Sequence, residues 1–359
     1  MKRLKDKITL FLLIVLFLQV IPHKTQAISA SSAILMEQKT GRVLFEKDAF
    51  TTRRIASITK IMTAILAVES GKMENITTVS PKATYTEGSS IHLKAGDKIK
   101  LKDLVYGLML RSGNDAAVSI AEYIGGSLEG FIYLMNKKAE EIGMKNTVFS
   151  NPHGLDDHEN HYSTSYDMAL LTRYAQNNPV YKKISSTKVY QYVSLDGQIK
   201  QSWINKNKLL TTLYKFSTGG KTGYTKRAKR TLVSTASKNN LNLIAVTLND
   251  AHDWNDHIHM FNQAFNNYEM VEISSPGKIK DFNHPVYENN IVTRQSFFYP
   301  LSTEERKNIS FKMSKLSPPK TKWRKNKVPH KIGTMYIKLY DNIIGNLPLY
   351  YEETTPQER

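Results

Sequence analysis

The feature that most constrains this chain is a serine and a lysine three positions apart, at the start of an apolar helical pattern. Ser57 and Lys60 are accompanied by apolar residues at helical spacing, namely Ile58, Ile61, Met62, Ile65 and Leu66. On a helix, positions i and i+3 share a face with Cβ atoms about 5–6 Å apart, so the two side chains can meet. The positive end of the helix disfavours a protonated lysine and favours a developing alkoxide, as a serine nucleophile with a lysine base requires. In isolation, the same spacing is more often a serine N-cap beside a solvated lysine.

Two further polar stretches fall where the chain is expected to turn or to pair. Ser112-Gly113-Asn114 separates expected helices at residues 101–110 and 115–124, so it lies at an exposed corner. Lys221-Thr222-Gly223 comes before a pair of expected strands over residues 231–248, which places it on or beside a sheet edge. Its glycines do not have the order of a phosphate-binding loop, which needs G-x-x-x-x-G-K-[ST] between a strand and a helix. Each stretch alone is ordinary loop chemistry.

The rest of the chain predicts helices and strands in two unequal parts. An antiparallel hairpin with its turn near Gly41 opens the larger part. Helices are expected wherever apolar residues repeat at helical spacing, at residues 57–70, 101–110, 115–124, 128–142, 168–176 and 254–268. The polar stretch after the first helix predicts loops and two short strands, Ile91–Leu93 and Ile99–Leu101. From about residue 271 the apolar runs become short and alternating, which predicts a small β domain.

A loop rich in histidine and carboxylate side chains, Asn151–His161, precedes one of the expected helices. His158 and His161 are three positions apart, which is not the H-E-x-x-H spacing that puts two imidazoles on one helical face. Thr164 and Asp167 fit a capping box in which Asp replaces the usual Glu. We therefore interpret the histidines as loop and capping groups, with a metal site as the minor alternative.

The N-terminus has the pattern of a signal peptide. Basic residues are followed by the apolar run Leu10–Leu18 and by the small residues of Thr25-Gln26-Ala27, which predicts a signal peptide over residues 1–27. An uncleaved membrane anchor is the alternative. The chain of 359 residues has no cysteine, which for an exported protein suits a bacterial cell surface.

The charge is strongly positive, with a formal net charge of +18. Because an exported protein meets little nucleic acid, the expected partners of this charge are anionic wall polymers or an anionic membrane face. Residues 306–331 carry ten Lys and Arg and no acid, so they are the expected contact region. A solvated basic surface without a specific partner is the alternative.

The three stretches in this order are the set shared by class A β-lactamases and penicillin-binding proteins. The chain resembles the low-molecular-mass penicillin-binding proteins that are serine-type D-alanyl-D-alanine carboxypeptidases. The resemblance covers roughly residues 28–268 and is carried by four segments, at residues 54–64, 108–117, 151–155 and 162–169. Residues 156–162 most resemble the carboxypeptidase made during sporulation in endospore-forming bacteria.

This resemblance implies an α/β fold, in which a β-lactamase/transpeptidase-like domain has an antiparallel sheet flanked by helices. The implied domains are residues 28–270, a penicillin-binding D,D-peptidase domain, and residues 271–359, a C-terminal β-rich domain. The implied reaction removes the terminal D-alanine from peptidoglycan stem peptides through an acyl-enzyme, with β-lactam antibiotics as covalent inhibitors. The implied location is the extracytoplasmic face of the membrane or the cell wall. No metal or organic cofactor is implied.

The resemblance also implies four catalytic residues. Ser57 attacks the carbonyl between the two terminal D-alanines, and Lys60 takes its proton. Ser112 relays a proton to the leaving D-alanine, while Asn114 hydrogen-bonds a substrate amide and Lys60.

The implied substrate-binding residues lie on the Lys-Thr-Gly stretch. Lys221 supplies positive charge for the terminal carboxylate and depresses the pKa of Lys60, Thr222 contacts the same carboxylate, and Gly223 completes the motif. Backbone N–H groups of Ser57 and Tyr224 form the oxyanion hole, worth about 3–4 kcal/mol per donor in comparable enzymes.

Two departures from the family pattern and two rival functions remain. Relatives carry Asp-Gly-Ile/Val before Lys-Thr-Gly, where this chain has Ser217-Thr218-Gly219-Gly220. Relatives tend to end in an amphipathic anchoring helix, whereas residues 350–359 here are polar. A β-lactamase-like hydrolase would need a second carboxylate base, and a non-catalytic penicillin-binding wall protein would have a vestigial site.

Overall fold

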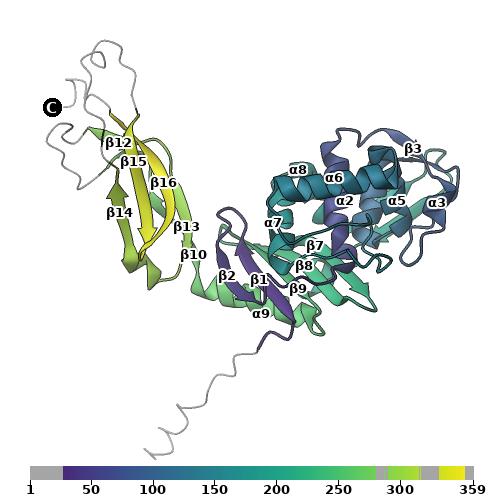
Figure 1. The fold of residues 1–359 in the computed structure, drawn as a ribbon, viewed down its shortest axis with the longest axis horizontal. Helices are drawn as coiled ribbons and strands as arrows, with labels where there is room; N and C mark the ends of the chain where they lie inside the picture. The colour runs from purple at the N-terminus through teal and green to yellow at the C-terminus, as the bar shows by residue number, and fades with distance from the viewer. Residues whose placement is uncertain (1–26, 280–286, 288–289, 315, 317–330, 352–359) are drawn as a thin grey trace, which may run out of the picture.

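The computed structural model describes residues 27–279, 287, 290–314, 316 and 331–351. It has a larger domain of sheet and helices and a smaller domain of strands (Figure 1). The predicted signal peptide, apart from Ala27, lies outside the described residues, and so do residues 315 and 317–330 of the basic segment. The α/β fold with a C-terminal β domain is as the sequence predicts.

A five-stranded antiparallel sheet forms the centre of the larger domain. Its strands, in the order β2-β1-β9-β8-β7, are β2 (Val43–Lys47), β1 (Ser32–Glu37), β9 (Leu241–Leu248), β8 (Lys229–Lys238) and β7 (Ser217–Thr225). The predicted hairpin at the N-terminus and the predicted strand pair over residues 231–248 are both confirmed. Strand β7 is an edge strand, so Lys221-Thr222-Gly223 lies at the sheet edge as expected.

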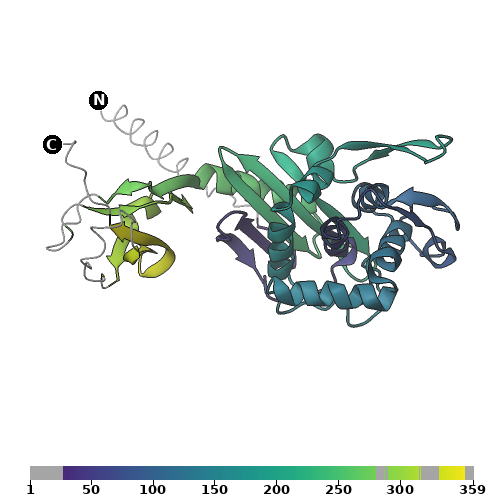
Figure 2. The ribbon, with the colours of Figure 1, turned by 90° about the horizontal axis from the view of Figure 1, so that it is seen from above.

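Alternation along the strands divides the core into two layers. Ile34 and Val246 pack into the larger apolar cluster with the helices on one face, whereas Leu35 and Ala245 pack into a second cluster on the other. The helices of the first face are α2 (Lys60–Glu69), α4 (Leu101–Tyr106), α5 (Asn114–Gly125), α6 (Leu128–Glu141), α7 (Ser165–Gln176) and α8 (Pro179–Ser185). Helix α9 (Asp253–Asn267) covers the second face (Figure 2).

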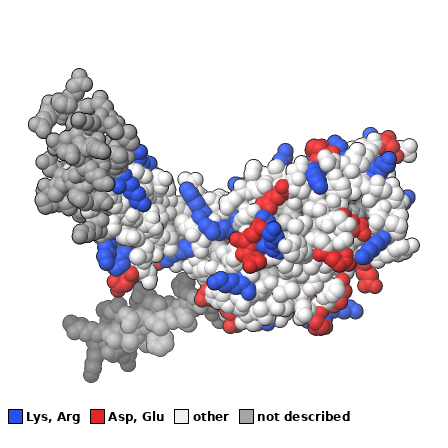
Figure 3. All heavy atoms as spheres, turned by 45° about the horizontal axis from the view of Figure 1, so that its top comes forward, with Lys and Arg blue, Asp and Glu red and all other residues white. Residues whose placement is uncertain are grey.

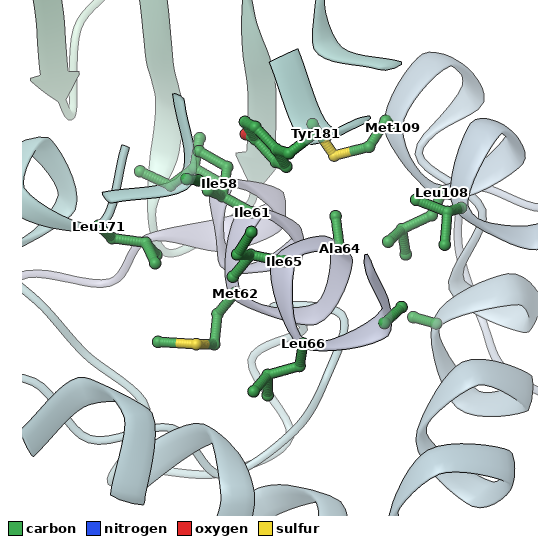
Figure 4. Close-up of a cluster of buried hydrophobic side chains, with 14 of the residues drawn as sticks. Ile58, Ile61, Met62, Ala64, Ile65, Leu66, Leu108, Met109, Leu171 and Tyr181 are labelled. Carbon is green, nitrogen blue, oxygen red and sulfur yellow. The ribbon is translucent and has the colours of Figure 1, made fainter. Parts of the chain in front are cut away.

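Helix α2 runs through the middle of the helical layer. Nine of its ten residues are buried, because the apolar side chains of this segment surround the helix axis and neighbouring helices cover every side. Ile61, Ile65 and Leu66 point into this cluster, where Leu108 and Leu171 approach from other elements (Figure 4). The helix ends just before Gly71, which adopts a left-handed φ of 71°.

The aromatic face of α9 is core, as the sequence predicts. Phe261 is fully buried, and the half-buried side chains that pack around the same cluster include Trp254, Ile258, Phe265 and Tyr268. Helix α9 thereby anchors the back of strands β8 and β9.

The segment after α2 differs from the prediction. Strand β3 (Ile76–Thr78) pairs with β4 (Lys98–Lys100), and a short helix α3 (Pro81–Thr84) lies between them. The predicted strand Ile91–Leu93 is wrong. The backbone N–H groups of Ile91 and Leu93 donate to the Asp115 carboxylate, which takes the place of a partner strand.

Other local features were predicted in part. Thr164 caps α7 by accepting from the Asp167 N–H, but the Asp167 carboxylate accepts from the Asn146 N–H and the Thr147 hydroxyl, so the capping box is half formed. The hairpin of β5 (Val189–Val193) and β6 (Lys200–Ile204) and the helical turn η3 (Leu209–Leu213) were not predicted.

The smaller domain consists of two sheets. Strand β10 (Glu269–Ser274) pairs with β13 (Phe297–Leu301). The second sheet has the order β11 (Gly277–Lys278), β12 (Ile291–Thr293), β16 (Asn342–Tyr351), β15 (Lys331–Leu339) and β14 (Ile309–Met313). A short helical turn, η4 (Glu305–Asn308), precedes β14.

Arg42, at the start of β2, ties the two domains together. Its guanidinium donates to the Pro300 carbonyl and the Glu305 carboxylate and lies over the rings of Tyr268 and Tyr299, 5.3 and 5.2 Å from their centroids. On the face drawn in Figure 3, acidic and basic side chains are interspersed over the larger domain. Among the described residues, no helix is long and apolar enough to cross a membrane.

Candidate active site

The segment that carries Ser57 is a tight turn and not the first turn of an α-helix. Residues Ala56–Thr59 form the short 3-10 helix η1, and α2 begins at Lys60. Ala56, directly before Ser57, has a left-handed φ of 48°, a conformation that is costly for a residue with a Cβ atom. The turn still brings the two side chains together, as the i, i+3 spacing predicts.

The amine of Lys60 is fully buried and has three close partners. Its Nζ atom lies 2.8 Å from Ser57 Oγ, 2.7 Å from Asn114 Oδ1 and 2.7 Å from the His153 carbonyl oxygen. A neutral amine has two N–H groups and one lone pair. Because the amide and carbonyl oxygens can only accept, the two N–H groups serve them, and the lone pair is left to accept the Ser57 hydroxyl proton.

The pKa of Lys60 lies well below its ordinary value. Burial is the largest cause, and the positive charges of Lys221 and Lys206 lower the pKa further, while Asp115 opposes them. The prediction that Lys221 depresses the pKa of Lys60 agrees in direction. The largest cause, however, is the loss of water around the buried amine, which the residue spacing does not indicate.

The Ser-Gly-Asn corner enters the site from the opposite side. The helix η2 (Gly107–Arg111) ends at Ser112, which adopts a left-handed φ of 65° and turns the chain into α5. Ser112 and Asn114 are both buried, so this corner is not the exposed turn that was predicted. The Asn114 amide nitrogen donates to the Glu87 carbonyl, which leaves its oxygen facing Lys60.

Strand β7 forms the third side. Lys221 is buried, and its Nζ donates to Ser112 Oγ at 3.1 Å and to the Thr222 carbonyl at 2.8 Å. Burial, with the charge of Lys206 second, lowers the pKa of Lys221 to about 7. A Cβ atom on Gly223 would lie 2.9 Å from the Ser57 backbone nitrogen, so only glycine lets β7 approach Ser57 this closely.

The two remaining predicted residues, Thr222 and Tyr224, lie near the C-terminal end of β7, where the strand is more exposed. Thr222 is half-buried, and the ring of Tyr224 is 63% exposed. The backbone of Tyr224 pairs with Arg230 on β8, which fixes this end of the edge strand.

The unusual Gly219-Gly220 pair has a structural reason. Gly219 and Gly220 have φ values of 152° and 134°, and a Cβ atom on Gly220 would overlap the Val233 carbonyl. The strand carries a bulge between Ser217 and Gly219. The departure from the family pattern at this point therefore shapes β7 just before Lys221.

Three partners of the site were missed from the sequence. The His153 carbonyl accepts a hydrogen bond from Lys60 Nζ. Lys206 Nζ donates to Ser89 Oγ beside the Ser112 corner. His161 contacts the Thr59 hydroxyl on the far side of the Ser57 turn. A backbone carbonyl has no sequence signature. The resemblance of residues 151–155 to the family was the only signal for His153.

The loop Asn151–His161 packs against the Ser57 turn and Lys60. His153 and His161 are buried, and burial lowers their pKa values to about 3 and about 4. His153 Nδ1 accepts from the Leu155 N–H, and His161 Nδ1 accepts from the Ser150 N–H, as expected for loop-stabilising groups. Within the described ranges, no three His, Asp or Glu side chains are grouped so that they could hold a metal ion.

The geometry thus joins a buried amine of lowered pKa to a serine hydroxyl and places a second lysine beside a second serine. Such an arrangement can activate a hydroxyl as a nucleophile and can hold an anionic group nearby. It is the arrangement of a serine acyl-transfer site with a lysine base.

Comparison with known proteins agrees with this fold. The family model of the D-alanyl-D-alanine carboxypeptidases (peptidase S11) matches residues 19–252, and that of the penicillin-binding protein 5 C-terminal domain matches residues 268–357. The chain therefore belongs to the D-alanyl-D-alanine carboxypeptidase family.

Individual relatives match over most of the chain. The D-alanyl-D-alanine carboxypeptidase DacF of Bacillus subtilis is 37% identical over 269 residues, 73% of this chain and 65% of the relative. DacC of Escherichia coli is 34% identical over 70% of this chain and 64% of its own length. The chain thus spans just under two thirds of these curated relatives.

Solved structures match over a greater length. DacD from Francisella tularensis has a TM-score of 0.71 at 27% identity and covers 93% of this chain and 95% of its own. Penicillin binding protein 5 from Haemophilus influenzae has a TM-score of 0.73 at 26% identity, with 91% and 97% covered.

Proposed function

We propose that this protein is a serine-type D-alanyl-D-alanine carboxypeptidase that removes the terminal D-alanine from peptidoglycan stem pentapeptides. The observation that carries the proposal is the 2.8 Å contact between Ser57 Oγ and the buried Lys60 Nζ, whose pKa lies far below its ordinary value. Membership of the family supports the reaction. The similarity to DacF of Bacillus subtilis supports a sporulation-type role, in which the reaction limits cross-linking of the spore cortex.

The acylation step follows from the contacts of Lys60. Ser57 Oγ attacks the carbonyl carbon between the two D-alanines while its proton passes to the lone pair of Lys60 Nζ. The negative charge on the carbonyl oxygen is stabilised by the backbone N–H groups of Ser57 and Tyr224. The C–N bond then breaks, and the proton that Lys60 accepted is relayed through the Ser112 hydroxyl, which lies beside Lys221, to the leaving amine.

The substrate carboxylate and the deacylation step complete the cycle. Lys221 and Thr222 bind the terminal carboxylate, and Asn114 holds the amide of the acyl part of the stem peptide. Water then hydrolyses the Ser57 ester and releases the shortened peptide. β-Lactams acylate Ser57 by the same first step, because their strained amide occupies the place of the D-alanyl-D-alanine bond.

The site is expected to act outside the cytoplasm. The pattern of residues 1–27 supports export, and the positive net charge of +18 supports contact with anionic wall polymers or an anionic membrane face. N-terminal sequencing of the protein recovered from the cell surface tests the cleavage after Ala27.

Mass spectrometry after treatment with benzylpenicillin tests the reaction. We expect a stable mass increase of one penicilloyl group, mapped to Ser57, and D-alanine release from a pentapeptide. Ser57→Ala is expected to abolish both. Normal D-alanine release by Ser57→Ala would disprove the mechanism, and a penicilloyl adduct that decays within seconds would favour a β-lactamase-like hydrolase.

A further inference from the structure

A chain of hydrogen bonds lies directly behind the Ser57 backbone. The Thr59 hydroxyl donates to the Ala56 carbonyl at 2.8 Å, and Thr59 Oγ1 lies 2.9 Å from His161 Nε2. The Ser150 backbone N–H donates to the other ring nitrogen, His161 Nδ1, at 3.0 Å. Ala56, Thr59 and His161 are all at most 2% exposed, so water does not compete for these groups.

The protons in this chain have a single consistent arrangement. Because a backbone N–H can only donate, His161 Nδ1 is the acceptor and the neutral ring carries its proton on Nε2. Nε2–H therefore donates to Thr59 Oγ1, and the Thr59 hydroxyl proton goes to the Ala56 carbonyl. Burial lowers the pKa of His161 to about 4, so the ring is neutral at neutral pH.

The Ala56 carbonyl belongs to the same planar unit as the Ser57 N–H. In a trans peptide the C=O and N–H bonds point in opposite directions, so a bond that fixes the carbonyl also aims the N–H. The left-handed φ of 48° at Ala56 means that the surroundings have to hold this peptide in place. On the N–H side lies Gly223, whose missing Cβ would be 2.9 Å from the Ser57 nitrogen.

We infer that His161 is a positioning residue for the oxyanion donor: through the Thr59 hydroxyl it fixes and polarises the Ala56–Ser57 peptide. The inference rests on the proposed function, in which the Ser57 N–H receives the negative charge of the substrate carbonyl oxygen. Hydrogen bonds in a chain polarise one another, so a carbonyl that accepts a bond makes its own N–H a stronger donor. His161 itself contacts neither Ser57 nor the place of the substrate.

The effect belongs to the transition state, because charge on the oxygen develops only there. Loss of the His161 bond should therefore lower the limiting acylation rate constant and leave the dissociation constant of the non-covalent penicillin complex unchanged. Substitution of a residue that only stabilises the fold would change neither the acylation rate constant nor the dissociation constant of the protein that remains folded.

Stopped-flow acylation by a chromogenic or fluorescent penicillin tests this with the full chain. We expect His161→Leu and Thr59→Val each to lower the limiting acylation rate about tenfold. His161→Gln should restore most of the rate, because its amide can accept from Ser150 and donate to Thr59. The double variant His161→Leu/Thr59→Val should be no slower than either single one, since both act through one peptide.

The exposed His158, in the same loop, supplies the matched control. His158→Gln should acylate at the wild-type rate. Thermal melts identify a temperature at which each variant is folded, and the acylation rates are compared at that temperature. The inference is overturned if folded His161→Leu or Thr59→Val acylates at the wild-type rate. It is also overturned if the double variant loses the product of the two single-variant reductions in acylation rate. If His161→Leu does not fold, Thr59→Val and His161→Gln decide the matter. Absence of acylation in the wild type would instead overturn the proposed function, and the inference with it.

Discussion

Two lysines occupy one small site, and their surroundings give them different properties. Burial lowers the pKa of both amines, and the positive charges of Lys221 and Lys206 lower the pKa of Lys60 further. Lys221, with a pKa of about 7, retains partial charge at neutral pH, and a bound carboxylate would increase that charge. The two lysines can thus differ in role although both are buried, because a positive charge on Lys221 disfavours protonation of Lys60.

Lys221 is expected to destabilise the folded protein at neutral pH. Its folded pKa of about 7 lies below the ordinary 10.5, so the cost of burying its charge is complete below pH 7 and disappears as the pH rises towards 10.5. Lys221→Met, which keeps the volume, should therefore raise the free energy of unfolding by about 1–3 kcal/mol at pH 6. The gain should vanish near pH 10.5, and penicillin acylation should be lost at every pH.

Thermal melts at pH 6 and pH 10 measure this difference. Lys208→Met, at an exposed lysine, serves as the control and should show no dependence of its effect on pH. A gain of equal size for Lys221→Met at both pH values would show that burial of charge is not its cause.

At the scale of elements, the site depends on how closely an edge strand approaches a helical turn. The missing Cβ of Gly223 leaves room for the Ser57 nitrogen and for the Thr231 hydroxyl, which donates to the Ile55 carbonyl. Strand β8 holds β7 in register from the other side. The Ser57 turn and strand β7 thus meet through close backbone approach at Gly223, and the Thr231 hydroxyl ties the turn to strand β8.

Gly223→Ala should separate the strand from the turn. The added methyl group has to displace either β7 or the Ser57 turn by a few tenths of an ångström, and we expect the acylation rate to fall at least a hundredfold while stability falls by about 1–3 kcal/mol. Gly197→Ala is the comparison, because a Cβ there meets nothing within 4 Å. Its φ of 72° should cost some stability but no activity. Acylation of Gly223→Ala at the wild-type rate would show that the close approach is unnecessary.

The sequence predicted those parts of the molecule in which a local residue pattern determines the secondary structure. Periodic apolar residues identified α2 and α9, and the three polar stretches fell on the three sides of one site. Ile91–Leu93 was assigned wrongly because its N–H groups are satisfied by Asp115, a side chain more than twenty positions away. The contact of Lys60 with the His153 carbonyl could not be predicted for the same reason: it joins distant segments through an atom that every residue has.

At the scale of the whole molecule, Arg42 forms a polar link between the domains. Its guanidinium lies between two aromatic rings and has bonds to a carbonyl and a carboxylate, with side chains of Arg42 and Glu305 only 14% and 15% exposed. The ion pair of Arg306 with Glu269 lies within the smaller domain, is largely exposed and should contribute little.

Arg42→Ala should loosen the smaller domain without affecting the chemistry. We expect about 2 kcal/mol less stability, seen in calorimetry as an earlier transition of the smaller domain, and an acylation rate within twofold of wild type. Arg306→Ala should leave the thermal transition in place. A large loss of acylation in Arg42→Ala would mean that the smaller domain shapes the active site.

The sheet order also has a consequence for the time course of folding. Strand β1 pairs with β9, so Ile34 meets Val246 only after more than two hundred intervening residues are available. The sheet that carries Lys221 therefore cannot close while the chain is still being made or threaded through a membrane, and the emerging segments have no native partner for most of that time. Pairing of such distant strands is slow. The protein should gain its activity late and all at once, after the whole larger domain has reached the compartment where it folds.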